Sequence, residues 1–246
     1  MASGLPEGIR ACLFDLDGVL TPTATVHAEA WKQTFDDFLR RRSYAQHVRY
    51  VPFDAVDDYD RYVDGRARAD GVRSFLRSRG ITLPEGRPGD TAASDTVLGL
   101  SNAKNALLLR LLARDGVQPY PGSVRYLSVV RKAGLATAVV SASANCRQVL
   151  TAAGLAGQFD AVVDGLTAQR QHLAGKPAPD TYLAAARALK VVPPAAVVYE
   201  DALAGVRAGR AGRFGWVVGV DRVGQAAELR KAGADVVVTD LAELLR

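Results

Sequence analysis

Two aspartates one residue apart, Asp15 and Asp17, follow the apolar residues 11–14 and precede Gly18. A short apolar run that ends at a turn signal predicts a strand buried on both faces. Because alternate side chains of an extended chain share a side, we expect the two carboxylates to lie close together. Carboxylates so close repel each other unless a cation or a shared proton relieves them, and Mg²⁺ takes oxygen ligands of this kind. The alternative interpretation is a polar turn in which an aspartate caps a helix.

A series of apolar runs further along the chain alternates with helical segments. The intervening segments, such as residues 182–190 and 226–232, are rich in Ala, Leu, Lys and Arg, which favour helix. This alternation predicts an α/β fold, a Rossmann-like three-layer core with a parallel sheet between helices. The strand runs after the first are residues 135–140, 159–163, 195–199, 216–220 and 235–238.

Polar and acidic side chains follow these predicted strands. Ser141 follows the second strand, and Glu200 and Asp201 follow a later one. In open α/β sheets the ligand crevice lies outside the carboxyl ends of the strands, so we expect these side chains on one rim with Asp15. Residues 220–246 are interpreted as the last helix–strand unit and carry no visible chemistry.

Residues 24–114 interrupt the alternation, because they lack short β-branched runs. They are predicted to form helices over residues 26–40, 68–79 and 103–114. We therefore divide the chain into an α/β core, residues 1–23 and 115–246, and an inserted all-helical cap domain, residues 24–114. A helical lid on an α/β core can close over a site and exclude water.

The composition of the 246 residues, 48% hydrophobic and 23% charged, is typical of globular proteins. No apolar run reaches the roughly 20 residues that span a membrane, and residues 1–10 lack a secretory signal. We therefore expect a cytoplasmic protein with no membrane partner, a monomer or a weak dimer. The net charge is +5, but the basic residues are scattered apart from residues 40–42. This pattern argues against nucleic acid as a partner and suits a small anionic ligand.

Asp15 and Asp17 can divide the work of phosphoryl transfer. A carboxylate such as Asp15 can act as the nucleophile and form an aspartyl-phosphate. Asp17 can then serve as general acid and base for the leaving and attacking hydroxyl groups. The oxygens of the transferred group need electrostatic stabilisation. Ser141 can donate one hydrogen bond to them, and Lys176 can supply a fixed cation.

Each supporting residue has a structural alternative. Ser141 could be a turn residue and Lys176 a surface lysine. Glu200 and Asp201 could be an acidic pair favoured by a helix dipole, or they could add oxygen ligands for Mg²⁺. Their joint placement at strand ends favours the catalytic interpretation.

Four segments, in order along nearly the whole chain, resemble the motifs of the haloacid dehalogenase superfamily: residues 15–21, 141–143, 176–180 and 200–201. Within it the chain most resembles the β-phosphoglucomutase-like group with a helical cap. The resemblance implies that Asp15 is the nucleophile and Asp17 the acid and base. It also implies that Mg²⁺ is held by Asp15, the Asp17 carbonyl and Asp201, with Glu200 adjacent.

The resemblance extends to the cap. Thr23, His27 and Trp31 match the hinge and first cap helix of that group. This match implies that Thr23 is a hinge residue and that His27 couples cap closure to catalysis. Gly65 and Arg68 resemble the cap loop, whose arginine grips the phosphate that is not transferred. The planar fork of arginine binds phosphate oxygens in pairs.

Two further matches concern phosphate and cap contacts. Lys104, followed by Asn105, resembles a second cap contact, and Ser143 and Asn145 match a core phosphate-binding stretch.

The chain also departs from the group at three positions. Asp64 stands where the mutases usually carry lysine, Gly71 where they often carry serine, and Ala144 replaces a common lysine. A carboxylate in place of an ammonium group near a bound phosphate would change substrate preference or cap docking.

The resemblance and the residues together predict a Mg²⁺-dependent phosphotransferase that acts on small sugar phosphates through an aspartyl-phosphate. The leading specific reaction converts β-glucose 1-phosphate to glucose 6-phosphate, with glucose 1,6-bisphosphate as the phosphoryl donor. The first alternative is a phosphatase, in which water attacks the phosphorylated Asp15. The second is a catalytically silent binding protein that keeps the fold; such a protein would be expected to have lost Asp15, Asp17 or Lys176, which are all present.

Overall fold

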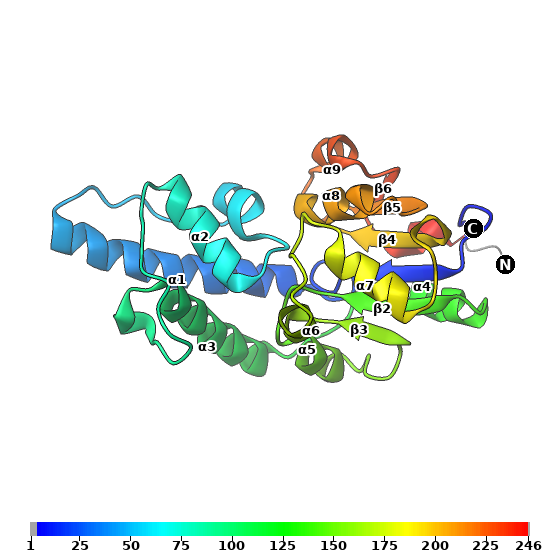
Figure 1. Ribbon diagram of the computed structural model, residues 1–246, viewed down its shortest axis with the longest axis horizontal. Coiled ribbons are helices and arrows are strands. Elements are labelled where there is room, and N and C mark those ends of the chain that lie inside the picture. Colours follow the sequence, from blue (N-terminus) through cyan, green and yellow to red (C-terminus); the bar gives the residue numbers. More distant parts are fainter. Residues whose placement is uncertain (1–3, 246) are drawn as a thin grey trace. The chain divides into compact units, whose positions relative to one another are not determined.

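The computed structural model describes residues 4–245, and the chain divides into two compact units (Figure 1). The α/β unit comprises Met1–Pro22 and Val117–Arg246, and the helical unit comprises Thr23–Gly116. The sequence predicted the two boundaries between residues 23 and 24 and between residues 114 and 115.

A six-stranded parallel sheet in the order β3-β2-β1-β4-β5-β6 forms the centre of the α/β unit. The predicted α/β fold class is therefore correct. β1 lies in the middle, paired on one side with β2 and on the other with β4, and all of its residues are buried. The strands are β1 (Ala11–Phe14), β2 (Ala136–Val140), β3 (Ala161–Val163), β4 (Ala196–Glu200), β5 (Trp216–Val220) and β6 (Val236–Val238).

Helices cover the sheet because its side chains are apolar on both faces. On β1, Leu13 packs in one cluster with Tyr182 of α7, whereas Phe14 lies edge-on to Tyr126 of α4, with ring centroids 6.4 Å apart. Since successive residues of a strand face opposite sides, α7 and α4 cover opposite faces. The helices of this unit are α4 (Pro121–Lys132), α5 (Cys146–Ala152), α6 (Gly165–Arg170), α7 (Asp180–Ala188), α8 (Leu203–Ala211) and α9 (Ala226–Ala232), with short 3₁₀ turns η3 (Pro193–Ala195) and η4 (Leu241–Leu244).

The helical unit has a core of its own, built around stacked aromatic rings. Phe35 of α1 lies against Trp31, Phe53 and Phe75, with ring centroids 4.2 to 5.2 Å apart. Each such ring buries a large apolar area, so these contacts contribute to the stability of the unit. Its elements are α1 (Thr23–Gln46), a π-helical turn η1 (Tyr59–Val63), α2 (Arg68–Ser78), a 3₁₀ turn η2 (Ala92–Ser94) and α3 (Val97–Asp115).

Several helix boundaries differ from the sequence predictions: α1 runs over Thr23–Gln46 and not over residues 26–40, and two other differences have local reasons. α3 begins at Val97 and not at residue 103, because the Thr96 hydroxyl accepts a hydrogen bond from the Gly99 N–H at 3.0 Å and caps the helix. α7 ends at Ala188 and not at residue 190, where Lys190 takes a left-handed φ of +56°.

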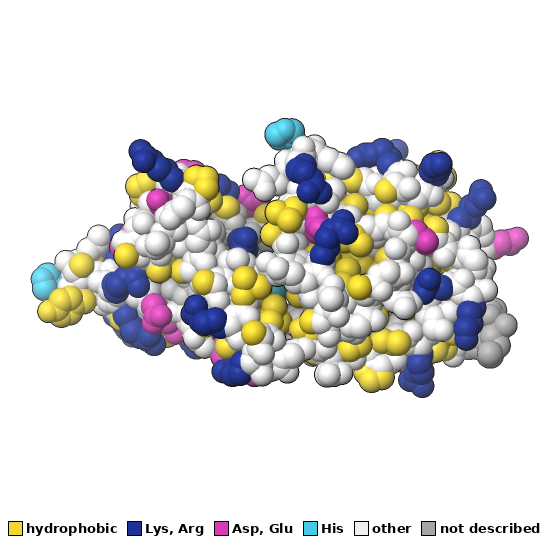
Figure 2. All heavy atoms as spheres, turned by 90° about the horizontal axis from the view of Figure 1, so that it is seen from below, with side chains coloured by type: hydrophobic (Ala, Val, Ile, Leu, Met, Phe, Trp, Pro, Cys, Tyr) yellow, Lys and Arg dark blue, Asp and Glu magenta, His cyan; other side chains and the backbone are white. Residues whose placement is uncertain are grey.

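No helix in the described part of the chain is long and apolar enough to cross a lipid bilayer. Figure 2 shows Lys and Arg side chains spread over the visible face among acidic and apolar groups, and not gathered into one patch.

Candidate active site

The sheet register brings the chemical side chains to one edge. Phe14 of β1 pairs with Tyr199 of β4, so Asp15 and Glu200, one residue further on, lie level at neighbouring strand ends. The Asp15 N–H donates to the Tyr199 carbonyl at 3.0 Å and extends the ladder by one residue. Ser141 follows β2 on the other side of β1 and is 2% exposed. The parallel sheet thus assembles the rim that the sequence predicted.

Lys176 is a buried cation at this rim. Its Nζ lies 2.5 Å from Asp15 Oδ1 and also donates to Glu200 Oε1, and its side chain is 2% exposed. It comes from the loop before α7, and it lies 5.0 Å from the ring centre of Tyr182. These contacts exclude the alternative of a surface lysine.

Glu200 accepts hydrogen bonds on both carboxylate oxygens. Besides Lys176, its Oε1 accepts from the Tyr182 hydroxyl at 3.0 Å, and its Oε2 accepts from the Ala202 N–H at 3.0 Å. Gly205 of α8 leaves room for this arrangement, since a Cβ there would lie 1.7 Å from Oε1. Glu200 therefore holds Lys176 in place, as the buried partner that a buried ammonium requires.

The buried charges change the acidity of the nucleophile. Burial raises the pKa of Asp15 well above its ordinary value; the charge of Lys176 opposes the shift, and those of Glu200 and Asp17 reinforce it. For Lys176, burial by itself would lower the pKa, but the negative charges of Asp15 and Glu200 outweigh it and the pKa is raised. Lys176 is therefore a permanent cation beside Asp15.

Three buried carboxylates make a set of oxygen donors suited to a hard divalent cation. Oxygens of Asp15, Glu200 and Asp201 lie within 4.8 Å of one another. One lysine supplies less positive charge than these carboxylates carry, and Mg²⁺ is a cation that prefers such donors. The backbone of Gly18 lies directly against the Asp201 carboxylate, since a Cβ on Gly18 would lie 1.7 Å from Asp201 Oδ2. The residues present therefore fit the magnesium ion that the resemblance implies.

Asp17 and the serine turn lie at the same strand ends. The Ser141 hydroxyl donates to Asp17 Oδ2 at 3.5 Å. The turn after β2 is fixed by its own side chains: Ser141 Oγ accepts from the Ser143 N–H, and Ser143 Oγ accepts from the Asn145 N–H, both at 3.1 Å. Ser141 is thus a turn residue, as its structural alternative stated, and it also lies at the rim; Ser143 belongs to the same turn.

In the helical unit, three of the expected residues form one cluster. Lys104 is fully buried, its Nζ lies 3.0 Å from His27 Nδ1, and it lies 5.0 Å from the ring centre of Trp31. Thr23 is the first residue of α1 and is 2% exposed.

Arg68 is the first residue of α2, and Gly65 precedes it with a left-handed φ of +66°. Arg68 Nη1 is buried without a hydrogen-bond partner, and burial lowers the pKa of the guanidinium. A buried guanidinium nitrogen of this kind is costly unless an anion pairs with it.

From the sequence, Tyr182 was predicted only to lie in a helix, and its contact with Glu200 was not predicted. A hydroxyl-bearing ring in a segment otherwise rich in alanine, so soon after Lys176, was the available signal. The contact itself joins a helix to a strand end and depends on tertiary packing.

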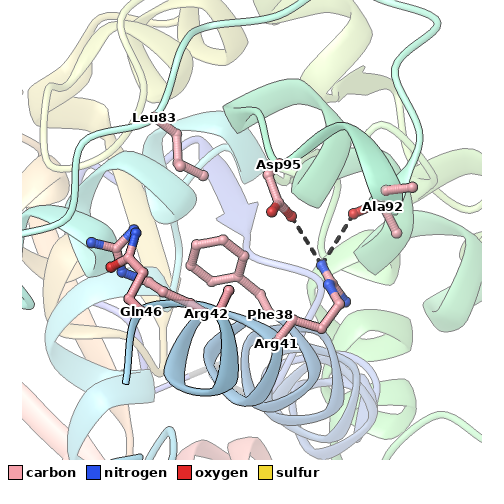
Figure 3. A pocket seen from close by; sticks show the side chains of 9 residues that line it. Phe38, Arg41, Arg42, Gln46, Leu83, Ala92 and Asp95 are labelled. Atoms are coloured by element: carbon pink, nitrogen blue, oxygen red, sulfur yellow. Dashed lines mark hydrogen bonds and ion pairs between the residues drawn. The ribbon is translucent and has the colours of Figure 1, made fainter. Parts of the chain in front are cut away.

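A separate pocket of about 540 Å³ lies in the helical unit (Figure 3). Phe38 and Leu83 give it an apolar wall, and Arg41 donates to Asp95 Oδ1 at 3.0 Å and to the Ala92 carbonyl at 3.2 Å. Its lining includes none of the residues expected to act in catalysis.

Comparison with known proteins identifies the class to which this fold and site belong. The family model of haloacid dehalogenase-like hydrolases matches residues 9–213, and the chain belongs to that family. The chain is 58% identical over 245 residues to a β-phosphoglucomutase of Mycobacterium bovis, a match that covers 98% of this chain and 94% of the relative. It is 30% identical to a β-phosphoglucomutase of Bacillus subtilis, which covers 96% of this chain and 92% of that one. A solved structure, a β-phosphoglucomutase from Clostridium difficile, is 25% identical with a TM-score of 0.74, covering 96% and 93% of the two chains.

Proposed function

We propose that this protein is a β-phosphoglucomutase, which converts β-glucose 1-phosphate to glucose 6-phosphate through a phosphorylated Asp15. The observation that carries the proposal is the buried Lys176, which contacts both Asp15 and Glu200 at the carboxyl ends of adjacent strands. The similarity to β-phosphoglucomutases over nearly the full chain supports the same reaction.

The two aspartates would share the work in each half of the reaction. Since Lys176 binds Oδ1 of Asp15, Oδ2 would attack phosphorus, and the bond to the donor oxygen would break. Asp17 would give its carboxyl proton to that leaving oxygen. In the second half Asp17 would take the proton of the attacking sugar hydroxyl, while the phosphorus bond to Asp15 breaks and the sugar–phosphate bond forms.

Magnesium is proposed as the cofactor, with Asp15, Asp201 and the Asp17 carbonyl as ligands and Glu200 adjacent. When bound, it would neutralise charge on the oxygens of the transferred phosphoryl group. The chain's own contribution is the fixed charge of Lys176 and the hydrogen bonds of the turn that contains Ser141, Ser143 and Asn145.

Glucose 1,6-bisphosphate is proposed as the phosphoryl donor, because a mutase of this kind needs a substrate that can phosphorylate Asp15 first. Arg68 would bind the phosphate group that is not being transferred. Its buried, unpartnered Nη1 supports this role, as does its place in the first turn of α2, where the helix dipole favours anions. We further propose that His27, Lys104, Trp31, Thr23 and Gly65 serve cap closure and substrate contact.

A phosphatase is the second candidate, and Asp64 is the observation that favours it. A carboxylate in the loop before Arg68 would weaken the hold on a second phosphate, and water would then take the phosphoryl group from Asp15. A cytoplasmic location and a monomer or weak dimer stay predictions.

One assay separates the two reactions. The enzyme is given β-glucose 1-phosphate, Mg²⁺ and a catalytic amount of glucose 1,6-bisphosphate, and glucose 6-phosphate and inorganic phosphate are measured together. A mutase produces glucose 6-phosphate in large excess, whereas inorganic phosphate alone identifies a phosphatase. The Asp15→Asn variant is the control, and we expect it to form neither product.

Replacement of Arg68 by alanine tests the second phosphate site. We expect mutase turnover to fall at least tenfold more than hydrolysis of a simple aryl phosphate, which has no second phosphate. Equal losses in both reactions would exclude this role. Arg77→Ala, on the same helix, is the matched control.

A further inference from the structure

The loop between β5 and α9 contacts two of the loops that form the active site, although the sequence analysis found no chemistry there. It is held in one conformation by Asp221, whose Oδ1 accepts from the N–H groups of Val223, Gly224 and Gln225 at 2.7 to 3.2 Å. Because the backbone of this loop is already ordered, its side chains are held in position without further loss of backbone conformational entropy.

Arg222 connects this loop to the turn after Asp17. Its Nε donates to the Gly18 carbonyl at 2.7 Å, and its Nη1 donates to the Thr239 carbonyl at 2.7 Å. Its guanidinium carbon lies 3.7 Å from the ring centre of Tyr120, close enough for a cation–π contact. Three contacts thus hold the Arg222 side chain in place: two hydrogen bonds to backbone carbonyls and one contact with an aromatic ring.

Gln225 connects the same loop to the other acidic motif. Its Nε2 donates to the backbone carbonyl of Asp201 at 3.2 Å. Gly18 and Asp201 are themselves pressed together, because a Cβ on Gly18 would lie 1.7 Å from Asp201 Oδ2. The loop therefore binds both partners of this close contact, Gly18 through Arg222 and Asp201 through Gln225.

We propose that Arg222 and Gln225 are positioning residues, which fix the spacing between the turn at Asp17–Gly18 and Asp201 and thereby set the affinity for the divalent cation. The inference rests on the magnesium site of the proposed function. Residues that orient metal ligands through hydrogen bonds change metal affinity by about ten- to hundredfold when they are removed.

The direction in which cation affinity changes when Arg222 is replaced distinguishes a positioning role from a purely electrostatic one. Arg222 carries a positive charge, and removal of a positive charge near carboxylates would strengthen the binding of a cation. Positioning predicts the opposite, because the Gly18 carbonyl loses its donor and the turn gains freedom to move. A weaker site in an alanine variant therefore identifies the geometric role.

The test is a titration of the whole protein with Mn²⁺ alone, followed by the electron paramagnetic resonance signal of the unbound ion. We expect Arg222→Ala to bind Mn²⁺ about ten- to hundredfold more weakly than the wild type, and Gln225→Ala to show a smaller loss. Arg210→Ala is the matched control, since Arg210 is also an arginine of the α/β unit, but its side chain is exposed and its ion pair with Asp235 lies on the surface. It should bind like the wild type.

Kinetics supply a second readout. The Mg²⁺ concentration for half-maximal activity should rise in the Arg222 variant, while kcat at saturating Mg²⁺ falls much less. If Arg222→Ala does not fold, as judged by circular dichroism, then Gln225→Ala and Tyr120→Leu carry the test, because each removes one contact of the same assembly.

Unchanged or tighter Mn²⁺ binding in the folded variants would overturn the inference and leave the proposed function standing. Absence of Mn²⁺ binding by the wild type would overturn the magnesium site, and the inference with it.

Discussion

At the scale of single residues, Lys176 decides what the site can be. It is buried between Asp15 and Glu200, and it stabilises two carboxylates that would otherwise lie unpaired away from water. A buried ion pair is weak evidence for stability as such, but its disruption is costly because it leaves a buried charge without compensation. Lys176 is therefore expected to be needed both for the stability of the fold and for catalysis.

Replacement of Lys176 by methionine tests this double role. We expect the free energy of unfolding to fall by about 3–5 kcal/mol, since Asp15 and Glu200 lose their shared cation, and turnover to be lost. Chemical denaturation and the product assay measure the two effects. Lys231→Met, at an exposed position of α9, should change neither. A stable Lys176 variant would mean that the two carboxylates share a proton.

Asp164 provides a pH-dependent contribution to stability. It caps α6, with Oδ1 accepting from the Thr167 N–H at 2.7 Å and Oδ2 accepting from Arg147 at 2.9 Å. Burial by itself would raise the pKa of Asp164, but these hydrogen bonds and the charge of Arg147 outweigh it and hold the pKa below its ordinary value. A depressed pKa means that the stabilisation is complete above the unfolded value, about 3.9, and is lost as the pH falls through the lower folded value.

Asp164→Asn isolates this charge, because asparagine also caps helices. We expect the variant to be less stable than the wild type by about 1 kcal/mol at pH 7, and the difference to shrink as the pH falls below about 4. Urea unfolding at several pH values measures it. A difference that does not change with pH would show that the charge plays no part.

Most of the candidate site was predictable at this scale because its residues follow apolar runs. Asp15, Ser141, Glu200 and Asp201 were identified from that position, and the structure brings them to one rim. Tyr182, Arg222 and Gln225 were not, since their hydrogen bonds join segments far apart in the sequence. Only the packed fold determines such pairs.

At the scale of the elements, the first turn of α8 supports the end of β4. Gly205 lies against Glu200, and the absence of a side chain lets the helix approach the strand. Glu200 cannot move away easily, because Lys176 and Tyr182 both bind its Oε1.

Gly205→Ala should therefore disturb the site through the helix. A Cβ would overlap Glu200 Oε1, at 1.7 Å, and overpacking of this kind typically costs about 1–3 kcal/mol. We expect lower thermal stability and a kcat reduced at least tenfold, because Lys176 shifts with Glu200. Gly89→Ala, where a Cβ meets nothing within 4 Å, is the control. Wild-type activity in the Gly205 variant would show that Glu200 need not be fixed.

The strands were predicted well from the sequence, because each coincides with a distinct apolar run. All six strands lie within or beside the predicted runs. The helix starts were less predictable, because caps such as Thr96 are single residues whose hydrogen bonds depend on the local turn. The short turns η1 and η2 were not predicted; η2 depends on a local capping box of Thr91 and Ser94.

At the scale of the whole molecule, each unit of the described chain has hydrophobic clusters of its own. The core of the α/β unit includes Leu13, Val140, Val198 and Tyr182, and the core of the helical unit is centred on Phe35 and its aromatic neighbours. Since the helical unit is one continuous segment with its own core, each unit is expected to have a stability of its own.

Phe75→Ala tests that independence. Phe75 is fully buried against Phe35 and Phe53, and its truncation should lower the stability of the helical unit by about 3–5 kcal/mol. Hydrogen exchange measures the effect segment by segment. We expect the amides of α1, α2 and α3 to exchange faster, and those of β1 and β4 to exchange as in the wild type. Mn²⁺ binding should also persist, because every proposed metal ligand lies in the α/β unit. Faster exchange in both units would instead show that the two cores unfold together, and the division of the chain would then have no thermodynamic meaning.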